Sequence, residues 1–249
     1  MEEFLLIVFA GKMLFLKVIL TAIALAFILP TQASAQATEQ VDNQNLTSYS
    51  LLCEAGDTQA CVKLARAYER GQGVEASPVH AAEFYALACV GDNDEGCTNL
   101  GMMYSQGRGV EENYTKAAEL FNTACDREYP KGCSALGYMH LTGRGVEKDA
   151  LLAFIFVGQG CKGGDAYGCT RLGLLYEKGH GVVENPAKAV ASYKKGCDGG
   201  DITGCASLGV MYQTGNGVAL NKVKAAKLFF QACDAGHADA CSKLEPLQN

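Results

Sequence analysis

The 249-residue sequence contains no tryptophan and few histidines or prolines, 4 and 5 respectively. Acidic side chains outnumber basic ones by 27 to 21, and the net charge of −6 argues against a nucleic-acid-binding protein that works by neutralising phosphates. The scattered histidines form neither an H-x-H-x-D nor an H-E-x-x-H motif, so we predict no metal site and no cofactor. A hydrophobic content of 49% excludes a disordered chain.

Residues 1–35 have the features of a secretory signal peptide. The apolar run Val18–Leu29 follows Lys17 and precedes Ala33-Ser34-Ala35, which fits the small-residue pattern of a cleavage site after Ala35. We therefore predict an exported protein, either periplasmic or secreted. Behind the cleavage site we expect a flexible segment, a repeat domain and a short tail, over residues 36–45, 46–245 and 246–249.

Two alternatives for the N-terminal segment stay open. The sequence begins with acidic residues, unlike a typical signal peptide, so Met13 is a second candidate for the start of translation. An uncleaved membrane anchor over residues 4–29 is the other alternative, although it would place Lys12 and Lys17 in the hydrocarbon. Membrane attachment is expected only by this route.

Twelve cysteines form pairs that are eight residues apart and recur every 36 residues. They are Cys53, Cys61, Cys89, Cys97, Cys125, Cys133, Cys161, Cys169, Cys197, Cys205, Cys233 and Cys241. In an oxidising compartment such an even set indicates disulfides. A bond within each pair is the simplest scheme, because bonds between repeats would leave the end copies unmatched. Zinc binding is the weaker alternative, since its ligands are usually about two to four residues apart.

Other residues repeat with the same period and predict two helices in each unit. The second cysteine, a leucine, a glycine or alanine and a tyrosine lie on one helical stripe. A G-x-G-V turn ends this helix, because glycine adopts left-handed dihedrals without strain. Pro78 and Pro186 mark the start of the second helix. The sequence therefore predicts an all-α solenoid of about five α/α hairpins, each of 36 residues.

The repeat C-x-x-G-D-x-x-x-C-x-x-L-G-x-x-Y-x-x-G-x-G-V-x-x-x-x-x-K-A resembles the Sel-like repeat, a relative of the tetratricopeptide repeat. Residues 161–189 show the pattern in full. The periodic cysteine pair makes the chain similar to the Helicobacter cysteine-rich protein (Hcp) family, over about residues 53–245. The resemblance implies hairpins stacked in a right-handed superhelix.

Members of that family are often labelled penicillin-binding proteins or β-lactamases, a label that requires the corresponding catalytic motifs. A serine β-lactamase needs S-x-x-K together with S-D-N and K-T-G elements, and the latter two are absent. The single S-x-x-K begins at Ser192, whose register in the other copies is apolar, so we predict a packing residue there. His140 replaces a repeated tyrosine and is likewise expected to be partly buried. We predict no catalytic residue, and weak β-lactam binding or hydrolysis is the alternative function.

Protein or peptide binding through a concave groove is the function that the repeat pattern favours. Opposite the predicted core stripe, one position recurs as Met102, Tyr138, Leu174 and Val210, with Arg66 in the first copy. The binding residues that we expect beside this apolar row are Asn99, Tyr167 and Arg171, flanked by Glu95, Lys131 and Lys178. An extended peptide or the terminus of a partner would fit such a groove. Packing against adjacent repeats is the alternative role of the row.

The second helix of the third copy is more apolar than its counterparts. Leu152 stands where other copies have histidine or lysine, and helical geometry directs Leu151 and Ile155 away from the core stripe. Exposed apolar clusters often mark contacts. We therefore predict a patch of Leu151, Leu152 and Ile155 for docking or self-association, with burial under a neighbouring loop as the alternative.

Overall fold

The computed structural model describes residues 45–244, which form twelve helices and no strand. The predicted signal peptide, residues 36–44 of the segment predicted behind it and the predicted tail lie outside the described residues. A first helix spans residues 45–54. The helices that follow it are α2 (Thr58–Arg70), α3 (Pro78–Val90), α4 (Asp94–Gln106), α5 (Tyr114–Asp126), α6 (Pro130–Thr142), α7 (Ala150–Lys162), α8 (Ala166–Lys178), α9 (Pro186–Asp198), α10 (Ile202–Thr214), α11 (Lys222–Asp234) and α12 (Ala238–Leu244).

Glycine and proline set the helix boundaries, as the sequence predicts. The first helix of each hairpin ends at a left-handed glycine, for example Gly143 with φ 71° and Gly179 with φ 67°. Pro78 and Pro186 are the first residues of α3 and α9, where the missing backbone N–H leaves no hydrogen bond unmade. These boundaries repeat in register, so the hairpins have the same length.

A small residue in each first helix allows the second helix of the hairpin to pack closely. A Cβ atom on Gly137 would lie 2.8 Å from the backbone nitrogen of Val157, and one on Gly173 would lie 2.6 Å from the ring of Tyr193. The repeated glycine therefore sets the distance between the two helices. Its partner, Val157 or Tyr193, is buried.

All twelve cysteines form disulfides, and every bond joins the two members of a pair that are eight residues apart. The predicted pairing is thereby confirmed. Each bond links the end of one helix to the next hairpin, with Cα–Cα distances between 4.3 and 4.7 Å. Closing a loop of this size stabilises a fold by about 2–3 kcal/mol on chain-entropy grounds. Six such bonds indicate an oxidising environment.

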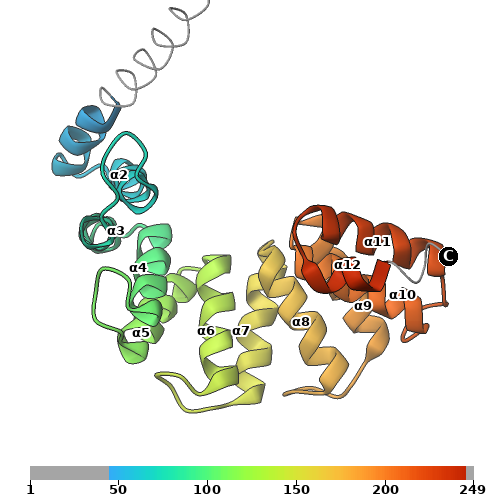
Figure 1. The fold of residues 1–249 in the computed structure, drawn as a ribbon. Coiled ribbons are helices and arrows are strands. Elements are labelled where there is room, and N and C mark those ends of the chain that lie inside the picture. Colours follow the sequence, from blue (N-terminus) through green and yellow to red (C-terminus); the bar gives the residue numbers. More distant parts are fainter. Residues whose placement is uncertain (1–44, 245–249) are drawn as a thin grey trace, which may run out of the picture.

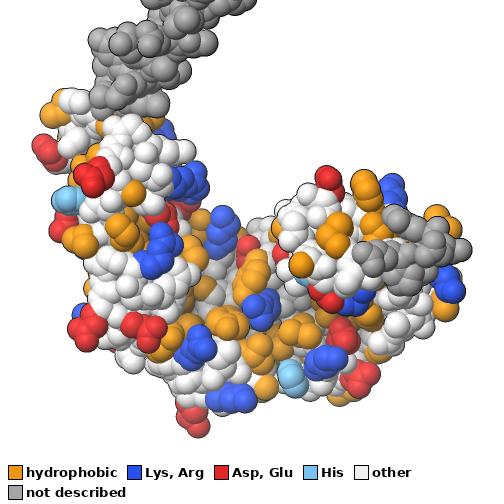
Figure 2. Space-filling view, in the orientation of Figure 1, with side chains coloured by type: hydrophobic (Ala, Val, Ile, Leu, Met, Phe, Trp, Pro, Cys, Tyr) orange, Lys and Arg blue, Asp and Glu red, His pale blue; other side chains and the backbone are white. Residues whose placement is uncertain are grey.

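The hairpins stack into an arc whose inner side is lined by the first helices (Figure 1). Contacts between successive first helices, α2 to α4, α4 to α6, α6 to α8 and α8 to α10, bring these helices together on that side. The space-filling view shows a hollow between the two arms of the arc, with apolar side chains on its floor (Figure 2). Within residues 45–244, no helix combines the length and apolar character needed to cross a membrane.

Candidate binding groove

Four successive first helices supply the predicted apolar row of the groove. Met102 lies on α4, Tyr138 on α6, Leu174 on α8 and Val210 on α10. Met102 is 41% exposed, and the other three side chains are half-buried. Val210 also packs against the buried cluster of the C-terminal hairpin. The row is thus most accessible at Met102, its N-terminal member, and more closely tied to the core at its C-terminal end.

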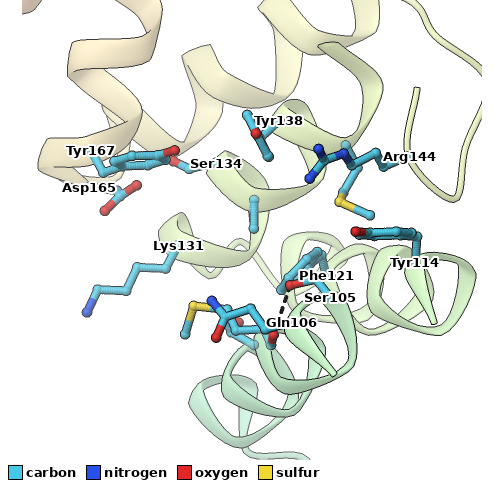
Figure 3. Close-up of a pocket in the computed structure, with 14 residues that line it drawn as sticks. Ser105, Gln106, Tyr114, Phe121, Lys131, Ser134, Tyr138, Arg144, Asp165 and Tyr167 are labelled. Carbon is cyan, nitrogen blue, oxygen red and sulfur yellow. Dashed lines mark hydrogen bonds between the residues drawn. The ribbon is translucent and has the colours of Figure 1, made fainter. Parts of the chain in front are cut away.

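A pocket of about 520 Å³ opens beside Met102 and Tyr138. Its apolar wall includes Phe121 and Met139, and Tyr167 closes the side next to α8. Figure 3 shows Tyr167 on one side and the pair of Tyr114 and Arg144 on the other. This pocket has the size and the mixed apolar and polar lining of a ligand site.

A smaller pocket of about 230 Å³ lies one hairpin further along, between α8 and α10. Leu174 and Arg171 line it, and Tyr167 is shared with the larger pocket. Three of the predicted binding residues thus line the smaller pocket, and one of them, Tyr167, joins it to the larger one. The groove therefore offers two neighbouring pockets that share Tyr167.

Arg171 lies between two aromatic rings at this junction. Its guanidinium carbon is 4.8 Å from the ring centre of Tyr138 and 4.7 Å from that of Tyr167. Nη2 of Arg171 also donates a hydrogen bond to the hydroxyl of Tyr167. Burial raises the pKa of Tyr167 above its ordinary value, although the charge of Arg171 acts in the opposite direction. The arginine is therefore held in a fixed position by cation–π contacts and one hydrogen bond.

Of the remaining predicted groove residues, only Lys131 lines one of these two pockets. Arg66 forms an ion pair with Glu95, which joins α2 to α4 along the inner face. Asn99 is half-buried on α4. Lys131 borders the larger pocket, whereas Lys178 pairs with Glu177 at 3.0 Å. Arg66 is thus engaged within the protein, and Lys131 is the wall residue closest to the candidate site.

Ser192 and His140 occupy the packing positions that the sequence predicts. The Ser192 side chain is 6% exposed, and its hydroxyl donates to the carbonyl oxygen of Lys188 at 2.9 Å. That hydroxyl is directed into its own helix rather than toward a cleft. His140 is half-buried and stacks on Phe156, with 5.6 Å between ring centres. Among residues 45–244, no group of three or more histidine, cysteine or acidic side chains could hold a metal ion.

The apolar patch predicted on α7 is exposed. Leu151, Leu152 and Ile155 are 58%, 36% and 42% exposed. Two other apolar residues of this helix are used internally: Phe156 stacks on His140, and Phe154 meets Tyr176 edge-on at 5.3 Å. None of the three patch residues lines either pocket of the groove.

Sequence reasoning missed Tyr114, Phe121 and Arg144, which complete the larger pocket. Phe121 is a repeated core residue, so nothing in its register marked it as a pocket residue. Tyr114 begins α5 and Arg144 lies between α6 and α7, with 5.4 Å from the guanidinium carbon to the ring centre. Both positions vary among the copies, and only the structure shows that they come together.

The stacked hairpins, the disulfide at each junction and the inner groove define a disulfide-linked α/α solenoid of the kind that binds proteins. More particularly, the chain belongs to the Sel1 repeat family. The family model matches residues 58–89, 94–129, 130–165, 166–201 and 202–237. The resemblance and the fold class predicted from the sequence are confirmed. No curated protein gives a significant match.

Several solved structures are similar to this chain. A Sel1 repeat protein from Oxalobacter formigenes is 29% identical, with a TM-score of 0.70, over 76% of this chain and 78% of that one. A protective antigen present in uropathogenic Escherichia coli strains is 25% identical, with a TM-score of 0.69, over 87% of this chain and 50% of its own. Helicobacter pylori cysteine-rich protein B is 31% identical over 53% of this chain and 96% of its own, with a TM-score of 0.44.

Proposed function

We propose that this protein is an exported, disulfide-stabilised scaffold that binds a protein or peptide partner in its concave groove. The observation that carries the proposal is the row of Met102, Tyr138 and Leu174 with two adjoining pockets on the inner face. Accessible apolar side chains beside polar walls are typical of protein-binding surfaces. The Sel1 repeat supplies the extended inner surface on which such a row can form.

The disulfides support both the location and the mode of binding. Each bond fixes one helix against the next, so the groove keeps its shape without a partner. A preformed groove loses little conformational entropy on binding an extended segment. We infer a periplasmic or secreted location because six disulfides form and persist in such compartments. The similarity to a protective antigen of Escherichia coli is consistent with this location.

The proposal is tested by changing Tyr138 and Leu174 together to Asp. Both side chains are half-buried and lie outside the buried clusters, so we expect loss of partner capture from envelope extracts with little change in melting temperature. A matched control changes Leu87 and Val90, exposed apolar residues of α3, to Asp. Capture that survives in the groove variant would contradict the proposal. A large loss of stability would instead assign Tyr138 and Leu174 to the core.

A further inference from the structure

Basic residues outnumber acidic ones around the two pockets, whereas acidic residues outnumber basic ones in the whole chain. Three basic residues adjoin the pockets, namely Lys131, Arg144 and Arg171. Within residues 45–244, none of them forms an ion pair with a carboxylate. The site therefore offers unpaired positive charge in a protein whose net charge is −6.

The two carboxylates that line the pockets are engaged in capping helices. Asp165 accepts a hydrogen bond from the backbone N–H of Gly168 at 2.9 Å, and Asp201 accepts one from that of Thr203 at 3.2 Å. An N-cap carboxylate interacts with the positive end of its own helix, which offsets part of its charge. Oδ2 of Asp201 is buried without a hydrogen-bond partner, so its charge also acts on the smaller pocket, and the three basic residues exceed the two carboxylates by one.

Arg171 is the best placed of these cations for recognising an anion. Its guanidinium carbon lies within cation–π distance of the rings of Tyr138 and Tyr167, and no carboxylate of residues 45–244 forms an ion pair with it. One donor nitrogen already bonds the hydroxyl of Tyr167. An arginine held in this way loses little side-chain freedom when it binds a carboxylate with two parallel hydrogen bonds.

We propose that the groove selects an extended peptide segment in which an acidic residue lies between two apolar residues. Arg171 binds the carboxylate, one apolar side chain enters the pocket of about 520 Å³, and the other enters the pocket of about 230 Å³. The shared residue Tyr167 fixes the order of these contacts, because it stands between the pockets and against Arg171. This inference rests on the proposed function and names the chemistry of the partner segment.

A set of short synthetic peptides provides the test. The probes are acetylated and amidated peptides with a central Phe-Asp-Leu or Leu-Asp-Phe in a Gly-Ser background, together with versions that carry Asn or Lys in place of Asp. Binding is measured by isothermal titration calorimetry on the disulfide-bonded protein. We expect an Asp peptide to bind about tenfold more tightly than its Asn counterpart. The reason is that a hydrogen bond between the guanidinium and a carboxylate contributes more to binding than one between the guanidinium and a neutral amide. The Lys peptide should bind more weakly than both.

Variants assign the preference to Arg171. Arg171→Gln should remove the difference between the Asp and Asn peptides, whereas Lys63→Gln should leave it unchanged. Lys63 is a matched control because it occupies the same register on α2 and lies 5.2 Å from the ring centre of Tyr49, away from the pockets. The preference of the unmodified protein for Asp over Asn is itself a test, so the inference stays falsifiable if Arg171→Gln does not fold.

The outcomes separate this inference from the proposed function. If Asp and Asn peptides bind equally, and Tyr138→Asp weakens both, the groove is a peptide site and the selectivity for an acidic residue is wrong. A uniform loss of affinity for all peptides in Arg171→Gln would also overturn the role of Arg171. If no peptide binds, this inference fails, and the capture experiment decides independently whether the groove serves another partner.

Discussion

The third hairpin consists of α6 and α7, and the fourth of α8 and α9. Their helices have the same lengths, but two of their side-chain contacts differ. In the fourth, the hydroxyl of Tyr193 donates to Glu177 at 2.7 Å. The corresponding residues of the third are Val157 and Leu141, which need no such bond. The same rule holds in the first hairpin, where Tyr85 donates to Glu69 at 2.9 Å. A buried hydroxyl is thus matched by an acceptor one helix away.

The second difference concerns an aromatic residue of the first helix and the residue of the second helix that contacts it. In the fourth hairpin the ammonium of Lys188 lies 5.4 Å from the ring centre of Tyr176. In the third hairpin His140 replaces the tyrosine and Leu152 replaces the lysine. The histidine instead stacks on Phe156. In the third hairpin both members of this contact thus differ from those of the fourth, whereas the first hairpin keeps Tyr68 and has His80 in place of the lysine.

The largest effect is expected from the disulfide that joins the two hairpins. Changing Cys161 and Cys169 together to Ala should lower the free energy of unfolding by about 2–3 kcal/mol, as measured by urea denaturation. The matched control changes Cys53 and Cys61, which close a loop of the same length at the N-terminal end. A solenoid unit contacts only its neighbours. The control should therefore free the N-terminal helix of residues 45–54 and leave the third and fourth hairpins to unfold cooperatively. Equal behaviour of the two variants would show that the hairpins are not coupled in this way.

Next in size is the glycine that both hairpins share. Gly137→Ala should cost about 1–3 kcal/mol, because the added Cβ would meet the backbone of α7 rather than a movable side chain. Gly173→Ala should cost less than Gly137→Ala, since its Cβ would meet the ring of Tyr193. Gly158 in α7 has no atom within 4 Å of its added Cβ, so Gly158→Ala should stabilise by about 0.5–1 kcal/mol. Thermal and urea unfolding would rank the three variants, and a Gly137 variant as stable as wild type would contradict the packing.

The paired tyrosine and glutamate distinguish the fourth hairpin from the third. Glu177→Leu should cost about 1–3 kcal/mol, because the Tyr193 hydroxyl would stay buried without its acceptor. Adding Tyr193→Phe should recover part of this loss, since the double variant carries neither polar group. A double-mutant cycle in urea measures the coupling. If the losses in free energy of unfolding were additive, the hydrogen bond between Tyr193 and Glu177 would not contribute to stability.

The same pair gives the fourth hairpin a dependence on pH. Burial alone would raise the pKa of Glu177, but hydrogen bonds from Tyr193 and Lys178 outweigh it and hold that pKa below the ordinary value of 4.5. A carboxylate with a lowered pKa stabilises the fold above its unfolded pKa, and this contribution is lost as the pH falls through the folded pKa. Unfolding measured below pH 4.5 should therefore be less steep in pH for the double variant than for wild type. Parallel curves would contradict the assignment.

Most of the fold can be predicted from the sequence because the same local signals occur in every copy of the repeat. Helix ends, the cysteine pairing and the packing glycine follow from local chemistry that recurs at 36-residue intervals. The groove row could also be predicted, since helical spacing places Tyr138 and Leu174 on the face opposite the core. A residue recurs at a given position of the repeat where its packing environment is the same in every hairpin.

The pockets could not be predicted because they depend on residues that do not repeat. Tyr114 and Arg144 come from a helix start and a loop, and they meet only after two hairpins have stacked. The position of Arg171 between two rings requires a tyrosine from its own helix and another from α6. No spacing within a single copy contains that arrangement. Specific binding chemistry thus arises between hairpins, whereas the fold arises within them.

The smallest effect on stability, and the last test of the comparison, concerns the exposed patch of the third hairpin. Leu151, Leu152 and Ile155 form the patch for which the sequence predicts docking or self-association, and all three side chains are exposed. Leu152→Lys with Ile155→Glu should change the free energy of unfolding by less than about 0.5 kcal/mol, since lysine already occupies the register of Leu152 in α9. Multi-angle light scattering should show a dimer in the wild type and a monomer in the variant.

An isolated apolar residue gives the control for this test. Val223 stands in the register of Leu151 on α11 and is 82% exposed. Val223→Lys should leave the mass in solution unchanged, because a single exposed apolar side chain buries too little area to hold two copies together. A wild-type protein that is already monomeric would remove self-association, and the patch would then have to be explained by contact with a different protein. A dimer that persists in the double variant would place the interface elsewhere, and the third hairpin would then differ from the fourth in packing alone.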